Sequence, residues 1–191
     1  MGPEAILLSL LQGDSGLEWA NRRQGWSAAS NDPVCSWYGI ICDTQDRQTV
    51  TGIFLPQSRL SGTIPSDLGR LTSLRSLTLS QNLIYGTIPP ALASLPYLEV
   101  LNLADNKITG TIPTFSSGYL HSLILGYNLL TGSIPNNIGH DNIGIAEFDV
   151  MHNLISGTIP ESFSLMKSLT ELSLSNNTIS GTIPGSLGEI E

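Results

Sequence analysis

Gly-x-Ile-Pro is repeated six times in this chain. The motif occurs as Gly-Thr-Ile-Pro ending at Pro65, Pro89, Pro113, Pro160 and Pro184, and as Gly-Ser-Ile-Pro ending at Pro135. Successive prolines are 24, 24, 22, 25 and 24 residues apart. A period in the twenties, kept over most of a chain, predicts a stack of similar turns. In such a solenoid each turn contacts only its neighbours, so we expect function on an open, repetitive surface and not in a buried pocket.

The repeat unit itself predicts short strands. It reads Leu-x-x-Leu-x-Leu-x-x-Asn-x-Leu-x-Gly-x-Ile-Pro, and the second copy fills it from Leu74 to Pro89. The Leu-x-Leu centre alternates with period two, which is typical of a strand with one buried face. Strands of successive turns should then lie side by side as a parallel sheet. The glycine suits a backbone geometry closed to residues with Cβ, and the proline ends the strand and bends the chain to the convex side.

One asparagine in each of five copies is expected to be buried where the chain leaves the strand. An amide both donates and accepts, so it can satisfy backbone groups of its own turn and of the neighbouring turn. We expect the stacked side chains to form a structural ladder of Asn82, Asn106, Asn128, Asn153 and Asn177. The first copy has Ser58 instead, whose hydroxyl should make the ladder weaker there.

Two copies depart from the repeat on the convex side. The segment between Pro113 and Leu120 is two residues short, and we expect Phe115 to supply the missing volume. The segment between Pro135 and Ile145 is one residue longer than the regular one. Loops tolerate such changes, so we interpret both as structural, with a local bend of the solenoid as the alternative.

Residues 1–49 do not repeat and are expected to cap the open end of the stack. Pro3 to Leu11 places Ile6, Leu7, Leu10 and Leu11 at helical spacing, and Trp19, Trp26 and Trp37 follow. Cys35 and Cys42 could form a disulfide or half of a metal site. The chain has no further cysteine and its three histidines lie far along it, which favours the disulfide and an oxidising compartment.

Composition narrows the possible partners and locations. The net charge is −8 and only eight residues are basic, so no basic stripe for nucleic acid is present. No apolar run approaches the roughly 18 residues that cross a bilayer. The N-terminus lacks the basic start and cleavage site of a secretory signal. These features leave two alternatives: a cytosolic protein, or an incomplete or processed piece of a secreted one.

The cap and the repeat together resemble one family. Trp26, Asp32-Pro33, Cys35-x-Trp37-x-Gly39-Ile40-x-Cys42 and Thr49-Val50-Thr51-Gly52-Ile53 look like the N-terminal cap of plant-type leucine-rich repeat proteins, such as receptor-like kinase ectodomains. The resemblance implies an α/β repeat solenoid: a right-handed superhelix with a parallel concave sheet, an irregular or 3-10 convex side, a helical cap and a second, irregular strand near each Gly-x-Ile-Pro. It further implies secretion or membrane display, glycosylation and ligand binding on the concave face, with a co-receptor as a second candidate partner.

We expect two parts: the cap over residues 1–49 and six repeats of about 24 residues over 50–191. The sequence stops at Glu191 in the middle of the sixth convex segment, and no cysteine-containing C-terminal cap is present. It is therefore expected to be a fragment of a longer solenoid.

No catalytic motif is present: the chain has no Gly-x-Ser-x-Gly, no P-loop and no His-Glu-x-x-His. We expect no enzyme activity, cofactor or metal in it. The variable positions between and just after the strand leucines should instead face outward on the concave side. Ligand-binding candidates among them are Phe54, Thr78, Val100, Asn102, Asp105, Ile124, Tyr127, Glu147, Asp149, His152, Glu171 and Ser173. They include apolar groups with no role in the core and an acidic patch of Glu147, Asp149 and Glu171, near enough to share one basic ligand group.

Three functions are compatible with this surface. The first is recognition of a protein or peptide ligand by an extracellular receptor fragment. The second is a secreted inhibitor of a cell-wall-degrading hydrolase, of the polygalacturonase-inhibitor type, which would need a C-terminal cap. The third is ice or crystal binding by rows of threonine, which Ser133 interrupts. A glycosylation sequon, Asn176-Asn177-Thr178, makes Asn176 the expected acceptor, because Asn177 belongs to the ladder.

Overall fold

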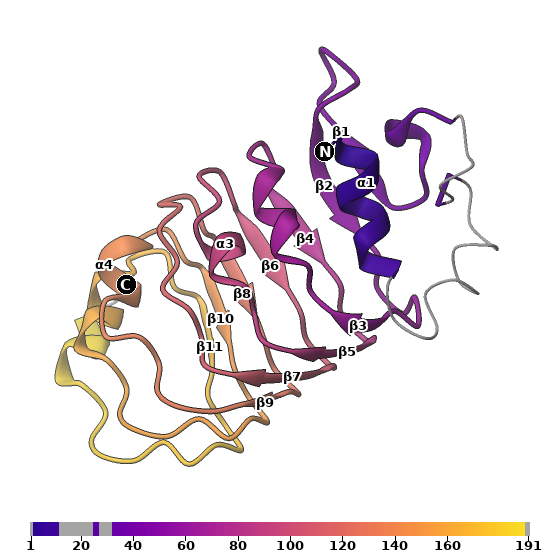
Figure 1. Cartoon of the computed structure of the whole chain (residues 1–191). Helices are drawn as coiled ribbons and strands as arrows, with labels where there is room; N and C mark the ends of the chain where they lie inside the picture. Colours follow the sequence, from indigo (N-terminus) through magenta and orange to yellow (C-terminus); the bar gives the residue numbers. More distant parts are fainter. Residues whose placement is uncertain (1, 12–24, 27–31, 190–191) are drawn as a thin grey trace.

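Each turn of the chain contributes one short strand to a seven-stranded sheet (Figure 1). The structure, a computed structural model, describes residues 2–11, 25–26 and 32–189. The strands, in the order in which they lie, are β1 (Ile40–Cys42), β2 (Val50–Phe54), β4 (Ser76–Thr78), β6 (Val100–Asn102), β8 (Ser122–Ile124), β10 (Glu147–Asp149) and β11 (Glu171–Ser173). All neighbours from β2 to β11 pair in parallel, whereas β1 pairs antiparallel with β2. This confirms the parallel sheet predicted from the Leu-x-Leu centres.

A second, smaller sheet runs along the Gly-x-Ile-Pro side of the stack. It contains β3 (Ser61–Thr63), β5 (Leu83–Gly86), β7 (Lys107–Gly110) and β9 (Leu129–Leu130), paired in parallel in that order. An isolated parallel bridge between Ser133 and Ser156 continues the same line. The second strand implied by the family resemblance is therefore present.

Short helices cover the convex side, which is opposite the large sheet. They are η3 (Ser66–Arg70), α3 (Pro90–Ala93), α4 (Ile138–Asp141), η4 (Glu161–Leu165) and η5 (Gly185–Glu189), of which the η elements are 3-10 helices. The short segment between Pro113 and Leu120 contains no helix or strand. There Phe115 is fully buried, as expected if its ring fills the space of the missing residues.

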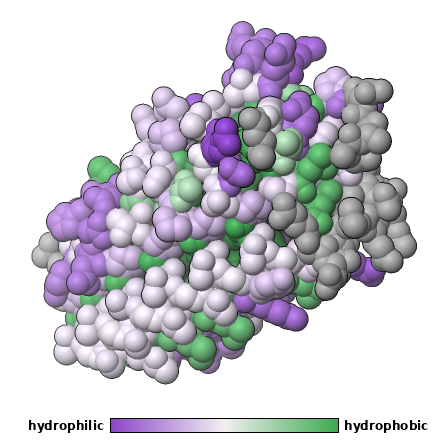
Figure 2. Space-filling view, in the orientation of Figure 1, coloured by the Kyte–Doolittle hydropathy of each residue, from purple (hydrophilic) through white to green (hydrophobic). Residues whose placement is uncertain are grey.

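The core is one continuous column of apolar side chains between the two sides. The central strand residues Leu77, Leu101, Leu123 and Phe148 are all fully buried. In the sixth turn, Leu172 and its neighbours are only partly buried. The face seen in Figure 2 is mostly pale, the colour of intermediate hydropathy, with green apolar positions among it. This agrees with a sequence in which only 13% of residues are charged.

Asparagine side chains join successive turns through backbone groups and not through one another. The Asn128 amide nitrogen donates to the carbonyls of Leu103 (3.0 Å) and Leu125 (3.1 Å), and its oxygen accepts from the Ile108 N–H (2.9 Å). The same pattern repeats at Asn82, Asn106, Asn153 and Asn177. In the first turn the Ser58 hydroxyl donates only locally, to the Pro56 carbonyl.

The N-terminal cap places apolar and aromatic side chains over the first turns. Helix α1 (Pro3–Leu8) continues into η1 (Ser9–Leu11), and Ile6, Leu7, Leu10 and Leu11 are buried as their spacing predicts. Trp26 and Trp37 are buried with ring centroids 5.3 Å apart. Their indole N–H groups donate to the carbonyls of Tyr38 and Asp32. Trp19 lies outside the described residues.

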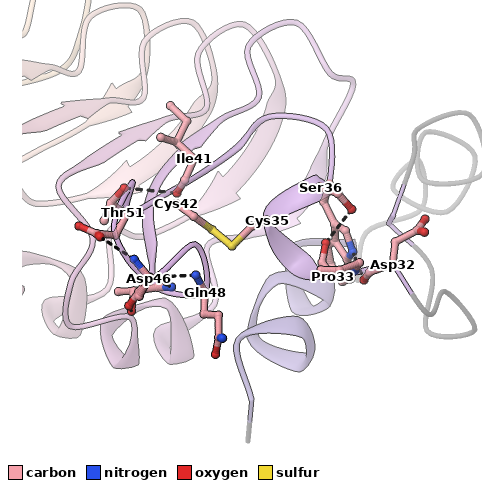
Figure 3. Close-up of a disulfide and its surroundings, with 12 residues drawn as sticks. Asp32, Pro33, Cys35, Ser36, Ile41, Cys42, Asp46, Gln48 and Thr51 are labelled. Atoms are coloured by element: carbon pink, nitrogen blue, oxygen red, sulfur yellow. Dashed lines mark hydrogen bonds between the residues drawn. A yellow bond between two sulfur atoms is a disulfide. The ribbon is translucent and has the colours of Figure 1, made fainter.

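A disulfide ties the cap to the sheet (Figure 3). It joins Cys35 in η2 (Val34–Ser36) to Cys42 at the end of β1, with Cα atoms 5.7 Å apart. Strand β1 pairs in turn with β2, so the cap is continuous with the repeats. Because each cysteine is bonded to the other, the alternative of half a metal site is wrong.

Within the described ranges, no helix has both the length and the apolar character that crossing a membrane requires.

Asn128→Ala is expected to destabilise the stack strongly. It leaves the buried Ile108 N–H without its partner, and a buried unsatisfied group costs about 1–3 kcal/mol. The carbonyls of Leu103 and Leu125 each lose one donor but keep the amides of Asn106 and Asn153. Urea unfolding should show a loss of at least about 2 kcal/mol. Lys107→Ala, an exposed change on the adjacent turn, is the control and should stay within about 0.5 kcal/mol. Equal stability of the two variants would contradict a structural role for the ladder.

Candidate functional site

The outward-facing residues of the large sheet form rows that run across the turns. The strand register aligns Phe54 with Thr78, Asn102, Ile124, Asp149 and Ser173. It likewise aligns Val100 with Ser122, Glu147 and Glu171. We call this outward side of the sheet the concave face. All of the predicted ligand-binding positions in the strands lie in these two rows.

Eleven of the twelve predicted positions are at least partly open to solvent. Phe54 and Tyr127 are the largest, with 54% and 51% of their surface exposed, and Asp105, His152 and Glu171 are also exposed. Thr78 differs, because only 8% of its surface is accessible. Its small side chain lies in register between Phe54 and Asn102, which are both larger. Thr78 is therefore the least accessible of the predicted positions.

A third row follows the strands, and its backbone is left-handed. Its members, which we call the turn row, are Gln57, Gln81, Asp105, Tyr127, His152 and Asn176, with φ angles between 50° and 57°. This conformation is unfavourable for residues with a Cβ. Hydrogen bonds between turns hold it: the N–H of Tyr127 donates to Met151 (2.9 Å), and that of Asp105 to Gly126 (3.0 Å). The row's side chains are thereby presented in line at the surface.

Side chains of the turn row contact one another along the stack. Gln57 and Gln81 are hydrogen-bonded. The Tyr127 and His152 rings stack with centroids 4.3 Å apart and planes 15° apart, and Nε2 of His152 lies 2.8 Å from Nδ2 of Asn176. Among the described residues, the Asp105 carboxylate between these two groups has no side-chain partner.

A hollow of about 560 Å³ opens beside Asp105. Its lining, which defines what we call the concave hollow, is Ser80, Gln81, Asn102, Ala104, Asp105, Tyr127 and Asp149. The predicted binding residues did not include Ser80, Gln81 or Ala104. Ser80 and Ala104 occupy the position directly after the second strand leucine, and small residues there are the signal that could have revealed a recess. A hollow of about 580 Å³ also lies among the last Gly-x-Ile-Pro segments, and none of the predicted site residues lines it.

Asp149 is a partly buried carboxylate in the lining of the concave hollow. Its Oδ1 accepts from the Met151 N–H at 2.8 Å. A Cβ on Gly126 would lie only 2.8 Å from its Oδ2, so the carboxylate occupies space that this glycine leaves open. Partial burial raises the pKa of Asp149, assisted by the charge of Glu147, although the Met151 hydrogen bond and His152 act in the opposite direction.

The acidic patch expected from the sequence lies partly beside this hollow. Glu147 and Glu171 are register partners on β10 and β11, and Asp149 is two residues further along β10. The Glu147 carboxylate accepts from the Ser122 hydroxyl at 2.6 Å, so it is hydrogen-bonded across to β8. Glu171 is exposed at the far side of the patch.

Two family models match the chain. The leucine rich repeat N-terminal domain matches residues 7–43, and the leucine rich repeat matches 73–95, 97–118, 119–140 and 168–190. A probable LRR receptor-like serine/threonine-protein kinase from Arabidopsis thaliana is 46% identical over 54 residues. That alignment covers 28% of this chain and 7% of the kinase, so the chain spans a small part of this relative's length.

Solved structures extend the similarity to nearly the whole chain. A chain of the BIR3–SERK2 complex from Arabidopsis thaliana is 32% identical, with a TM-score of 0.71 over 82% of this chain and 85% of that one. The ectodomain of the Arabidopsis receptor kinase HAESA, solved with an IDA peptide hormone ligand, is 29% identical. Its TM-score is 0.81 over 98% of this chain and 31% of that one.

Asp149→Asn should stabilise the protein slightly at neutral pH. A raised pKa means that the folded state favours the protonated carboxyl, so its contribution is full below the unfolded value of 3.8 and is lost as pH rises through the folded value. Asparagine keeps the acceptor for Met151 without the charge. We expect a gain of at most about 0.5 kcal/mol at pH 7 that disappears at low pH, measured by urea unfolding across pH.

Asp46→Asn is the matched control with the opposite trend. The N–H groups of Gln48 and Thr49 and the Thr49 hydroxyl lower the pKa of Asp46, so its contribution is present above the unfolded value and is lost as pH falls. This variant should therefore lose stability at neutral pH. The same pH trend in both variants would rule out burial as the cause of the Asp149 shift.

Proposed function

The chain belongs to the leucine-rich repeat family, and from this premise we propose that its concave face recognises a protein or peptide ligand for a receptor-like protein. The observation that carries the proposal is the turn row. Six successive turns hold a non-glycine residue in a left-handed conformation and so display its side chain beside the open sheet. Exposed Tyr127 and Phe54 supply the aromatic surface that is enriched where proteins bind partners.

An extended peptide suits the shape of this surface. The rows on the sheet and the turn row run in register across neighbouring turns, so each turn offers a similar set of side-chain positions. HAESA, which was solved with a peptide hormone, has the same arrangement of repeats over 31% of its chain. The proposal assigns binding, and no catalysis, to this segment.

We place the chain outside the cell, secreted or displayed at the plasma membrane as part of a longer protein. The disulfide between Cys35 and Cys42 supports this location, since such bonds persist in oxidising compartments. A co-receptor is a second candidate partner, because a chain of the BIR3–SERK2 complex shares the fold.

Selection from a phage-displayed library of random linear peptides, with the disulfide-bonded chain as bait, tests the function. Enriched peptides should lose at least tenfold in affinity with Tyr127→Ala or Glu171→Ala, measured by calorimetry, because both side chains are exposed on the concave face. Tenfold corresponds to about 1.4 kcal/mol.

Arg70→Ala on η3 is the control for this experiment. Its exposed ion pair with Asp67 (3.6 Å) contributes little, and it lies on the convex side. Peptides that bind all concave variants as tightly as the original chain would place recognition elsewhere. Failure to enrich any peptide would count against peptide recognition.

We also propose that Asn176 carries an N-linked glycan. Its side chain is exposed in the turn row, whereas the Asn177 amide is committed to the carbonyls of Val150 and Leu174. A glycan there would lie beside His152 and limit the ligand at this end of the concave face. Mass spectrometry of protein secreted from eukaryotic cells should find the sugar on Asn176 and none after Asn176→Gln. Unmodified Asn176 in secreted protein would refute the assignment.

A further inference from the structure

We propose that the concave hollow takes a guanidinium group, the head of an arginine side chain on the bound partner. The inference rests on the proposed function and names the chemistry of one contact. The group would lie with its plane on the free face of Tyr127 and donate to the carboxylates of Asp105 and Asp149, which line the same hollow.

The aromatic wall of the hollow is already fixed in place. His152 stacks on one face of the Tyr127 ring, and His152 is held in turn by Asn176. Because His152 belongs to the following turn, the opposite face of the ring is directed toward the preceding turn, where Asp105 and most of the other lining residues lie. An immobilised aromatic face next to carboxylates favours a planar cation, which can stack and form hydrogen bonds at its edge at the same time.

Acceptors for such a cation remain available on both sides. Asp105 has no side-chain partner among the described residues, although its neighbours in the turn row do. Asp149 uses Oδ1 for the Met151 N–H, which leaves Oδ2 over Gly126. Two carboxylates and no basic side chain among the lining residues give the hollow a charge that complements a guanidinium.

The volume and the remaining lining also fit a side chain delivered by a peptide. A hollow of about 560 Å³ is within the range of about 300–1,000 Å³ that ligand sites occupy. Ser80 and Ala104 in its lining have small side chains, and Gly126 leaves space beside the Asp149 carboxylate. Gln81 and Asn102 contribute neutral amides that can bond the backbone flanking the arginine.

Burial supports the same assignment. It raises the pKa of Asp149, because partial removal from water disfavours the charged carboxylate. A cation beside the carboxylate would offset this penalty. Lysine would satisfy the charge, but a compact ammonium can neither stack on Tyr127 with a planar face nor bridge two carboxylates with a fixed fork.

N-acetyl-arginine amide is the probe for the test, since it needs no known ligand. Titration of the ¹⁵N-labelled chain should shift the amides of Asp105, Tyr127 and Met151 together, with a dissociation constant in the millimolar range. N-acetyl-citrulline amide, which has nearly the same shape without the charge, should bind at least tenfold more weakly. The corresponding lysine amide should also be weaker, by several-fold.

Variants of the hollow should change this binding in a defined pattern. Asp105→Asn and Asp149→Asn should each weaken the arginine probe at least fivefold. Gly126→Ala keeps every charge but pushes against the Asp149 carboxylate, so it should weaken the probe as well. Asp67→Asn, the same substitution on the convex side, should have no effect.

Two results would overturn the inference: equal binding of the arginine, citrulline and lysine amides, or arginine binding that survives both aspartate substitutions. Either could occur while selected peptides still bind the concave face, in which case the proposed function stands and the arginine contact fails. If the arginine amide binds but no peptide ligand is found, the arginine contact stands and the proposed function fails.

Discussion

One buried side-chain amide per turn joins the successive turns of this solenoid. Parallel strands three residues long leave backbone groups unpaired where the chain turns away from the sheet. Asn128 and its counterparts bond the carbonyls of their own turn and of the preceding turn, and accept from an N–H of the preceding turn. The amide thereby satisfies groups that water cannot reach and aligns each turn with the one before it. The apolar column then stacks in a single register.

The same amide explains why the preceding residue is left-handed. The chain must reverse sharply to direct the asparagine inward, and the residue before it absorbs that reversal with φ near 55°. Glycine would do so without strain, yet Gln81, Asp105 and Tyr127 occupy these positions. Their N–H groups are bonded to the next turn, so the stack holds a conformation that an isolated turn would not retain. The left-handed conformation that the scaffold requires thus also displays the side chains of the turn row at the surface.

The sequence predicted most of the scaffold and less of the site. Features that depend on residue types at fixed spacing can be recognised along the chain. They are the repeat period, the leucines at the strand centres, the asparagines of the ladder and the Cys35–Cys42 disulfide. The burial of Thr78 depends on the sizes of side chains one turn away. The stacking of Tyr127 on His152 depends on rotamers chosen across turns, and the hollow depends on the small Ala104 beside larger neighbours. Such features depend on contacts between side chains of neighbouring turns, and the sequence of a single repeat does not contain this information.

Another side-chain amide joins the two convex segments whose lengths depart from the repeat. Asn142 is fully buried near the end of the long fourth convex segment, and its Nδ2 donates to the carbonyl of Phe115 (3.0 Å) in the short third one. The bond satisfies a carbonyl that a regular convex helix could otherwise have paired. Strands β6, β8 and β10 keep an unbroken register although the loops behind them differ in length. The concave hollow spans these same turns, so Asp105, Tyr127 and Asp149 are aligned by the sheet and not by the length of the convex loops.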